Sequence, residues 1–279
     1  MPHSKLKAMK YHLFIAVMAL CSQVLAAKVD TVSVPSAAMN KPIKTVVVTP
    51  EGYVHRDSLP VVYLLHGYSG NYADWVNKAP EIKDLADQYG LIIVCPDGGY
   101  GSWYWDSPAD ESFRYETFVS TELVTWVDNR YKTVRSRKGR AITGLSMGGH
   151  GALYLAMRHL DVYGAAGSTA GGVDIRPFPL NWDMAKRLGS YAEYPKRWDA
   201  HTVINMLHRL TPDTLALIID CGTSDFFYRV NEQLHQALLD RNIPHTYITG
   251  PGAHNWTYWQ QSITYQLLYF SKFFARKQS

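Results

Sequence analysis

Cysteine is scarce in this sequence, with three residues in 279. A small scaffold held together by several disulfides is therefore excluded. Cys95 and Cys221 each close an apolar run, which places both at strand ends. The strand order expected below keeps the two apart, so we interpret them as buried free thiols and not as a disulfide.

A strong charge bias is also missing. The formal net charge is +4, from 28 basic and 24 acidic residues. Residues 1–26 hold three lysines and no acidic residue, so the formal charge of the remaining chain falls from +4 to +1. A nearly neutral chain without a basic run has little electrostatic attraction for nucleic acid, which we therefore exclude as a partner.

Other signals are absent as well. After the N-terminus, no apolar run reaches the ~18 residues that a membrane span requires. No spacing of His, Cys and Asp indicates a metal site, and no G-x-G-x-x-G follows the first strand, so neither a metal nor a dinucleotide cofactor is expected. A hydrophobic share of 47% in 279 residues instead predicts a globular chain with a sizeable core.

The N-terminus differs from the rest of the chain. Lysines precede an apolar run at residues 13–21, and small residues follow it, which is the order of a secretory signal peptide. We predict that residues 1–26 are a signal peptide cut near Ala26, that residues 27–279 form the mature domain, and that the protein is secreted or periplasmic. An anchoring leader is the alternative. Cys21 invites a lipoprotein interpretation, but the leucine before it stands where such sites need a small residue.

Apolar, β-rich runs alternate with amphipathic ones along the chain, which is the pattern of a mostly parallel sheet flanked by helices. The eight expected strands are residues 32–34, 44–48, 61–65, 91–95, 140–143, 164–168, 215–221 and 246–249. The expected helices are residues 82–89, 116–131, 148–159, 229–241 and 256–275. No helix separates the first two strands, which favours an antiparallel start. Residues 171–211 lack strand signals, and we expect a short insertion with small helices over the C-terminal edge of the sheet.

The strongest motif is Gly-Leu-Ser-Met-Gly-Gly at residues 144–149. It follows an expected strand and opens an expected helix, which is the context of the nucleophile elbow in the α/β-hydrolase fold. A serine in this tight turn exposes its hydroxyl, and Gly144 and Gly148 let the two chain segments approach. The following helix N-terminus favours developing negative charge. We therefore predict Ser146 as the nucleophile, against the alternative of a plain strand-to-helix turn.

A nucleophilic serine needs a base and an orienting acid, which follow it along the chain in this fold. His254 lies in a Gly-rich loop after the last strand and is the predicted base, whereas His235 falls in a helix and His245 begins a strand. Asp225 lies in the loop after the seventh strand and is the predicted acid. Asp220, still within that strand, is the alternative.

The oxyanion hole is expected to combine two backbone amides. One is the amide of Met147, directly after the nucleophile. The other is the amide of Tyr68, because Gly67 lets the backbone turn after the third strand. His66 precedes this turn, and we interpret it as a structural residue that supports the loop.

Aromatic residues gather in the loops expected at the same edge of the sheet. Trp103 and Tyr104 follow the fourth strand, and Trp256 follows the predicted base. We predict that these three contact a sugar or an aromatic acyl group by stacking. Trp105, Trp259 and Trp182 belong to the same group, and ordinary core packing is the alternative for each.

At these residues the sequence resembles the esterase D-like branch of the α/β hydrolases. This branch includes S-formylglutathione hydrolases, short-chain esterases, feruloyl and acetyl-xylan esterases, and mycolyltransferases. The matching pieces are residues 64–67, 102–104, 106–108, 144–149 and 220–223, together with Asp225, Gly252, His254 and Trp256. The resemblance implies the nucleophile, acid and base positions for Ser146, Asp225 and His254 and the oxyanion amides for Tyr68 and Met147.

These observations predict an exported serine carboxylesterase without a cofactor. It would act through an acyl-enzyme on a small-molecule or carbohydrate ester, with feruloyl, acetyl or short-chain acyl groups. An acyltransferase with the same triad and an S-formylglutathione hydrolase-like thioesterase remain as alternatives. A non-catalytic carbohydrate-binding protein fits less well, because binding gives no reason to keep all three residues of the triad.

Overall fold

The computed structural model describes residues 26–276. The predicted signal peptide, residues 1–26, lies outside the described residues except for Ala26. None of the helices within residues 26–276 is long and apolar enough to cross a membrane.

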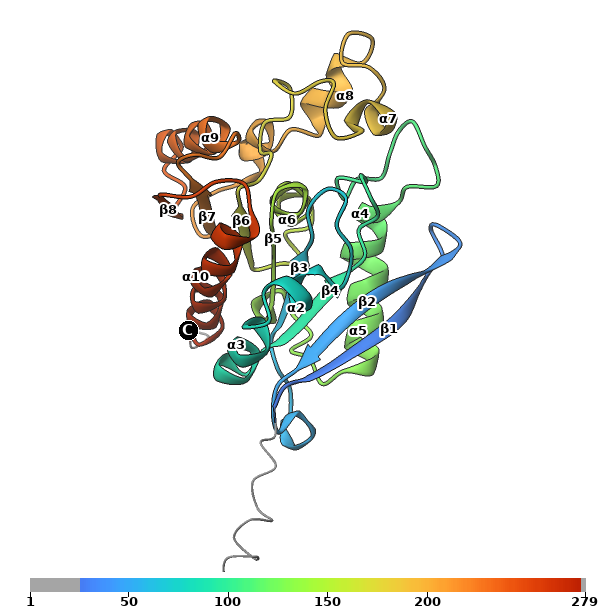
Figure 1. The fold of residues 1–279 in the computed structure, drawn as a ribbon, viewed down its shortest axis with the longest axis vertical. Coiled ribbons are helices and arrows are strands. Elements are labelled where there is room, and N and C mark those ends of the chain that lie inside the picture. Colours follow the sequence, from blue (N-terminus) through green and yellow to red (C-terminus); the bar gives the residue numbers. More distant parts are fainter. Residues whose placement is uncertain (1–25, 277–279) are drawn as a thin grey trace, which may run out of the picture.

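A single eight-stranded sheet runs through the molecule (Figure 1). Its strands lie in the order β1-β2-β4-β3-β5-β6-β7-β8. Their bounds are β1 Lys28–Ser36, β2 Lys41–Thr49, β3 Val61–Leu65, β4 Ile92–Pro96, β5 Arg140–Gly144, β6 Ala165–Thr169, β7 Ala216–Gly222 and β8 Thr246–Gly250. From β4 to β8 every neighbouring pair is parallel, so the carboxyl ends of these strands share one edge of the sheet. The expected α/β-hydrolase architecture is confirmed.

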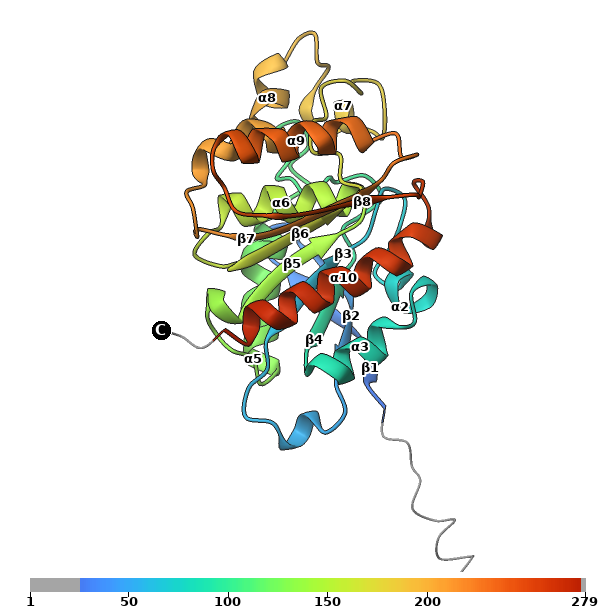
Figure 2. The ribbon, with the colours of Figure 1, turned by 90° about the vertical axis from the view of Figure 1, so that its left-hand side faces the viewer.

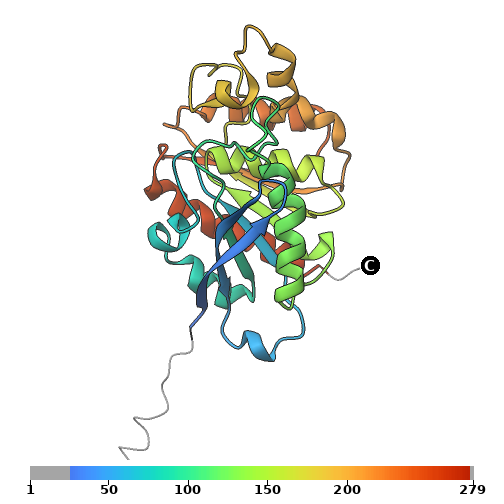
Figure 3. The same cartoon turned by 90° about the vertical axis from the view of Figure 1, so that its right-hand side faces the viewer.

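The antiparallel start of the sheet is confirmed too, but its strands are longer than expected. β1 and β2 pair over nine residues each and β2 then pairs with β4, with the hairpin lying at one side of the sheet (Figure 3). The apolar pattern predicted only residues 32–34 for the first strand, because most of β1 is exposed or half-buried and carries polar side chains. Backbone pairing extends such an edge strand without an apolar signal.

Helices cover both faces of the sheet (Figure 2). One face carries α3 Ile82–Tyr89 and α10 Trp256–Phe274, and the other carries α5 Leu123–Arg130, α6 Met147–Arg158 and α9 Tyr228–Asp240. The helix expected over residues 116–131 is divided, because α4 Tyr115–Thr117 passes through a π-helical turn, η2 Phe118–Glu122, before α5 begins. Short 3₁₀ turns occur at η1 Tyr53–His55 and η3 Arg137–Gly139.

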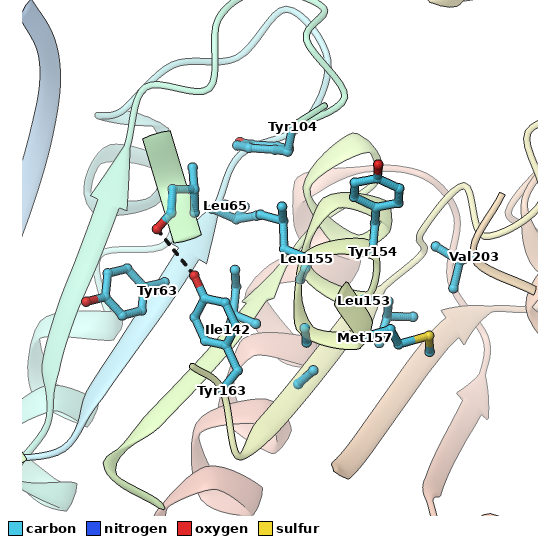
Figure 4. Close-up of a cluster of buried hydrophobic side chains, with 14 of the residues drawn as sticks. Tyr63, Leu65, Tyr104, Ile142, Leu153, Tyr154, Leu155, Met157, Tyr163 and Val203 are labelled. Carbon is cyan, nitrogen blue, oxygen red and sulfur yellow. Dashed lines mark hydrogen bonds between the residues drawn. The ribbon is translucent and has the colours of Figure 1, made fainter. Parts of the chain in front are cut away.

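The core lies in two layers, one on each face of the sheet. The layer under α6 joins strand residues such as Tyr63 and Ile142 to Leu153 and Leu155 of the helix (Figure 4). The layer under α10 joins alternate strand residues such as Val62 and Leu64 to helix residues. Burial of both faces explains why β3 and β4 are apolar without alternation.

The insertion, residues 171–211, lies beyond the carboxyl ends of the strands, at the top of Figure 1. It contains α7 Met184–Leu188, α8 Pro195–Ala200 and the 3₁₀ turn η4 Val203–Arg209, as expected. The short helix α2 Asp74–Lys78, which was not expected from the sequence, lies near the same edge.

Cys95 on β4 and Cys221 on β7 are both buried and free. Strands β3, β5 and β6 separate them in the sheet. The expectation of two separate thiols is confirmed, and the strand order is its physical reason.

Candidate active site

Ser146 occupies a strained turn between β5 and α6. Its backbone angles are φ 55° and ψ −117°, a conformation that costs a non-glycine residue about 1–3 kcal/mol. The turn is held by a hydrogen bond of 2.9 Å from the Ser146 amide to the Thr169 carbonyl and one of 2.7 Å from the Gly148 amide to the Leu145 carbonyl. The predicted elbow is therefore present, and its serine side chain lines a cavity.

The glycines of the motif are required by close packing. A Cβ at Gly144 would lie 2.6 Å from the Leu65 carbonyl oxygen, and a Cβ at Gly148 would lie 2.5 Å from the same atom. Real Cβ atoms do not approach an oxygen so closely, so any larger residue would push β3 away from the elbow. The strain at Ser146 is thus maintained by the fit of three backbone segments.

His254 and Asp225 complete a chain of hydrogen bonds to Ser146. His254 Nε2 lies 2.9 Å from Ser146 Oγ, and His254 Nδ1 lies 2.7 Å from Asp225 Oδ2. A carboxylate can only accept, so Nδ1 carries the proton and donates it, which leaves Nε2 free to accept from the serine hydroxyl. The structure therefore brings the three predicted residues together in the arrangement of nucleophile, base and orienting acid.

The loops after β7 and β8 set this geometry. Asp225 is buried, and its second oxygen, Oδ1, accepts the Phe227 amide at 2.8 Å. The two loops are joined by hydrogen bonds from Thr223 to Gly250 and from Ser224 to Gly252. Both carboxylate oxygens of Asp225 are thus used, one by the backbone and one by His254.

Asp220, the alternative acid, lies elsewhere. It is fully buried in β7 and accepts hydrogen bonds from Thr169 Oγ1, Ser262 Oγ and Gln266 Nε2 at 3.1, 2.7 and 2.6 Å. These contacts link β6, β7 and α10, and His254 is not among them. Burial raises the pKa of Asp220 to about 6, although its three donors favour the charged form.

This raised pKa predicts a pH-dependent stability. Between about pH 4 and pH 6 the folded chain binds a proton at Asp220 that the unfolded chain has released, so this contribution to stability falls as the pH rises. The loss approaches about 3 kcal/mol above pH 6. The Asp220→Asn variant lacks the ionisation, so its free energy of unfolding should rise relative to the wild type between pH 4 and pH 7. Urea unfolding at several pH values measures the difference, and a difference constant with pH would contradict the prediction.

The oxyanion loop, residues 66–70, follows β3 and packs on the elbow. A Cβ at Gly67 would lie 2.6 Å from Leu145 Cδ1 and 3.5 Å from Ser146 Cβ, so glycine permits the contact. Within residues 26–276, neither the Tyr68 amide nor the Met147 amide has a hydrogen-bond partner. Two unpaired amides beside the serine suit a substrate oxygen.

His66 supports this loop and takes no part in the triad. Its Nε2 accepts the Gly98 amide at 2.7 Å, and its Nδ1 donates to the Gly67 carbonyl at 2.8 Å. Burial lowers its pKa and keeps the ring neutral, which this pair of bonds requires. His235 and His245, which lie late in the chain like the predicted base His254, hydrogen-bond to each other.

The predicted aromatic contacts are only partly at the site. Trp256 lines the cavity of about 380 Å³ in front of Ser146. Trp103 and Tyr104, by contrast, are 1% and 0% exposed and belong to the core, where Figure 4 shows Tyr104. The expectation that these two stack on a substrate is therefore corrected. Both have left-handed backbones, with φ 56° and 61°, in the loop after β4.

Other residues form the walls of the cavity instead. Trp182 of the insertion stacks on Phe226, with ring centroids 5.5 Å apart, and Phe226 lies 4.2 Å from the His254 ring. Asp74 and Lys78 of α2 also line it, with an ion-pair distance of 3.0 Å. Phe226, Asp74 and Lys78 carry no sequence signal of such a role, whereas Trp182 belonged to the expected aromatic group.

Within residues 26–276 the structure places no group of three His, Cys, Asp or Glu side chains suited to hold a metal ion.

Comparisons with known proteins agree with this geometry. The family described as "Putative esterase" matches residues 36–270. The acetyl esterase of Caldicellulosiruptor saccharolyticus is 26% identical over 231 residues, which cover 78% of this chain and 86% of that protein. Esterase Rv1288 of Mycobacterium tuberculosis is 30% identical over 222 residues, which cover 70% of this chain and 48% of that protein, so the chain spans about half its length.

Among solved structures, a ferulic acid esterase is similar with a TM-score of 0.78 and 26% identity, over 90% of this chain and 100% of that one. The family match spans most of the chain, and the shared fold extends over nearly all of it. The protein therefore belongs to the Esterase family of carboxylic ester hydrolases, which have the α/β-hydrolase fold.

Proposed function

We propose that this protein is an exported serine esterase that removes acetyl or feruloyl groups from carbohydrates, or cleaves short-chain esters, through an acyl-enzyme on Ser146. The observation that carries the proposal is the unbroken chain of hydrogen bonds from Ser146 through His254 to Asp225 at a solvent-reached cavity. Export rests on the signal peptide predicted from the sequence.

In the first half of the reaction, Ser146 Oγ attacks the ester carbonyl while His254 Nε2 takes the hydroxyl proton. Asp225 holds the imidazole in the required tautomer and stabilises its positive charge. The amides of Tyr68 and Met147 stabilise the oxyanion. His254 then donates its proton to the leaving alcohol, and the acyl group remains on Ser146. In the second half, water attacks the acyl-enzyme and His254 takes its proton. The acyl–Oγ bond then breaks, His254 returns the proton to Ser146 Oγ, and the acid leaves.

Two considerations support the substrate class. The cavity is bordered by Trp182, Phe226 and Trp256, whose rings suit a sugar or an aromatic acyl group. Relatives of the chain include an acetyl esterase and a ferulic acid esterase. Trp103 and Tyr104 are buried, so the proposal places stacking on the rings of the cavity wall.

A hydrolysis panel tests the proposal. Acetyl, butyryl and feruloyl esters are compared with acylated xylan oligosaccharides and with S-formylglutathione, each with and without an acceptor sugar. Faster cleavage of the sugar esters is the expected result. Transfer of the acyl group to the acceptor would identify an acyltransferase, and preference for the thioester would identify a thioesterase.

Phe226→Ala should change substrate preference. The ring is 50% exposed and lies beside the predicted base, so a bulky ester can stack on it. Loss of a stacked ring costs roughly 0.5–1.5 kcal/mol, or about two- to tenfold. We expect kcat/KM to fall by this factor more for feruloyl or oligosaccharide esters than for ethyl acetate, which has no ring to stack.

The matched control is Tyr194→Ala, which removes an exposed aromatic ring of the insertion that does not line the cavity. It should leave the ratio of the two kcat/KM values unchanged. Equal losses on large and small esters in Phe226→Ala would show that the ring supports the loop and does not contact the substrate.

A further inference from the structure

We propose that Tyr68 and Asp183 form a positioning pair, through which the insertion holds the oxyanion loop in its catalytic conformation. The inference rests on the proposed function, because the oxyanion loop acts only if Ser146 forms a tetrahedral intermediate. In this proposal the insertion not only lines the cavity but also positions the Tyr68 amide that stabilises the oxyanion.

The contact joins two loops that both line the cavity. Tyr68 belongs to the oxyanion loop, and Asp183 of the insertion lies 115 residues later and directly follows Trp182. The Tyr68 hydroxyl donates a hydrogen bond of 3.1 Å to Asp183 Oδ2. Partial burial and this carboxylate raise the pKa of Tyr68 to about 12, so the hydroxyl keeps its proton and remains the donor.

The Asp183 side chain does not cap helix α7, although Asp183 is the N-cap residue of that helix. At this position an Asp side chain usually accepts an amide hydrogen of its own helix and stabilises it. Here the side chain makes no capping bond. One oxygen accepts from Tyr68, and the other lies 3.0 Å from Lys186 Nζ. The carboxylate thus joins the oxyanion loop, through Tyr68, to its own helix, through Lys186.

The backbone at this point is strained. Trp182 and Asp183 both have left-handed backbones, with φ 49° and 58°, which is an unfavourable conformation for residues other than glycine. Such a conformation persists only where several contacts fix it. The Trp103 indole donates to the Trp182 carbonyl at 3.1 Å, and the Tyr68 hydroxyl holds the next residue. Both contacts come from loops that follow strands β3 and β4, next to the elbow.

The Tyr68 ring has little room to move. A Cβ at Gly101 would lie 3.0 Å from this ring and 3.5 Å from Asp183 Cβ, so glycine provides the space in which the two side chains meet. Tyr100 packs edge-on against Tyr68 at 4.9 Å, and its carbonyl accepts the Ser69 amide at 2.8 Å. A displaced ring therefore moves the backbone of Tyr68, whose amide is the proposed oxyanion donor.

These contacts predict a specific kinetic effect. The oxyanion amide acts in the transition state, so its displacement lowers kcat and leaves KM nearly unchanged. Removing a whole oxyanion donor costs about 10²–10³ in kcat, and an amide that is displaced but still present should cost about tenfold. Tyr68→Phe and Asp183→Ala should each show this loss. The double variant should be no slower than either, because both changes remove the same bond.

The test is this double-mutant cycle with two readouts. One is kcat and KM on p-nitrophenyl butyrate. The other is the rate at which a fluorophosphonate labels Ser146, followed by mass spectrometry. In labelling, Ser146 Oγ displaces fluoride from phosphorus while His254 takes the proton, and the phosphoryl oxygen occupies the oxyanion hole. The labelling rate therefore reports on the hole whatever the natural ester is.

Two further variants act as controls. Asp183→Asn keeps an oxygen acceptor for the Tyr68 hydroxyl and should restore most of the rate. Lys186→Ala removes the other partner of Asp183 and leaves the Tyr68 bond, so it should match the wild type.

Equal losses in both singles and the double, with an unchanged melting temperature, would support the pair. Losses that multiply in the double variant, or a raised KM with an unchanged kcat, would overturn the proposal. The hydrogen bond would then be only a structural contact between the insertion and the oxyanion loop. If the wild type cleaves no ester of the panel, the proposed function fails, and the labelling rates alone decide on the pair. A wild type that is not labelled at Ser146 would overturn both.

Discussion

Ser146→Ala is expected to lower ester hydrolysis by at least about a thousandfold, because the covalent route is lost with its nucleophile. The residual rate would come from the oxyanion amides and from substrate binding. The fold should be little changed, since alanine has no greater steric difficulty than serine at φ 55° and the hydroxyl has one partner, His254. Hydrolysis of p-nitrophenyl butyrate and thermal unfolding measure the two effects.

Ser224→Ala is a matched control, because this exposed serine lies beside Asp225 and makes its loop contact through the backbone amide. It should keep the wild-type rate. Near-full activity in Ser146→Ala would contradict the proposed mechanism. A wild type that hydrolyses no ester would favour the carbohydrate-binding alternative.

The sequence could predict the sheet and the elbow for one physical reason. Strands buried on both faces are often continuous apolar runs, and β3 and β4 are so apolar that the sequence predicts their bounds to within about one residue. A catalytic residue at the carboxyl end of a parallel strand then comes to the same edge as the others. This rule predicts that Ser146, Asp225 and His254 lie near one another, although it gives no distances.

The sequence could not predict which aromatic rings face the cavity. Trp103 and Tyr104 lie in a loop at the correct edge, but two successive left-handed residues direct their side chains into the core. The sequence does not predict such backbone angles in non-glycine residues. Phe226 was missed for the opposite reason, because one aromatic residue in a loop beside Asp225 shows no periodicity. The cavity wall depends on loop conformation, which long-range contacts determine.

Strain is concentrated in the same region. Ser69, Trp103, Ser146 and Trp182 all have left-handed backbones, and each belongs to a loop at the carboxyl edge of the sheet. Residues in such conformations persist where the surroundings fix them, and they gather at functional sites. Asn40, Asp213 and Asn242 have positive φ elsewhere in residues 26–276, so the strain at the carboxyl edge agrees with the site that the motif indicates and does not locate it alone.

Asp225→Asn is expected to lower kcat by about 10⁴, the loss that follows when an imidazole is held in the wrong tautomer. The carboxylate accepts two donors, the Phe227 amide at Oδ1 and His254 Nδ1 at Oδ2. An asparagine side chain has one oxygen, so its NH₂ group must face one of those donors. If that group faces His254, the ring has to accept at Nδ1 and carry its proton at Nε2, where it can no longer take the proton of Ser146.

Asp220→Asn is the matched comparison, because it makes the same chemical change at a buried carboxylate five residues earlier. There the Ser262 hydroxyl can reverse its hydrogen bond and accept from the new NH₂ group, while the remaining oxygen still accepts from Gln266 and Thr169. Its kcat at pH 7 should stay within a few-fold of the wild type. Measured side by side on one ester, an inactive Asp220→Asn with a normal Asp225→Asn would reverse the assignment. Equal and modest losses in both would show that His254 keeps its tautomer without either carboxylate.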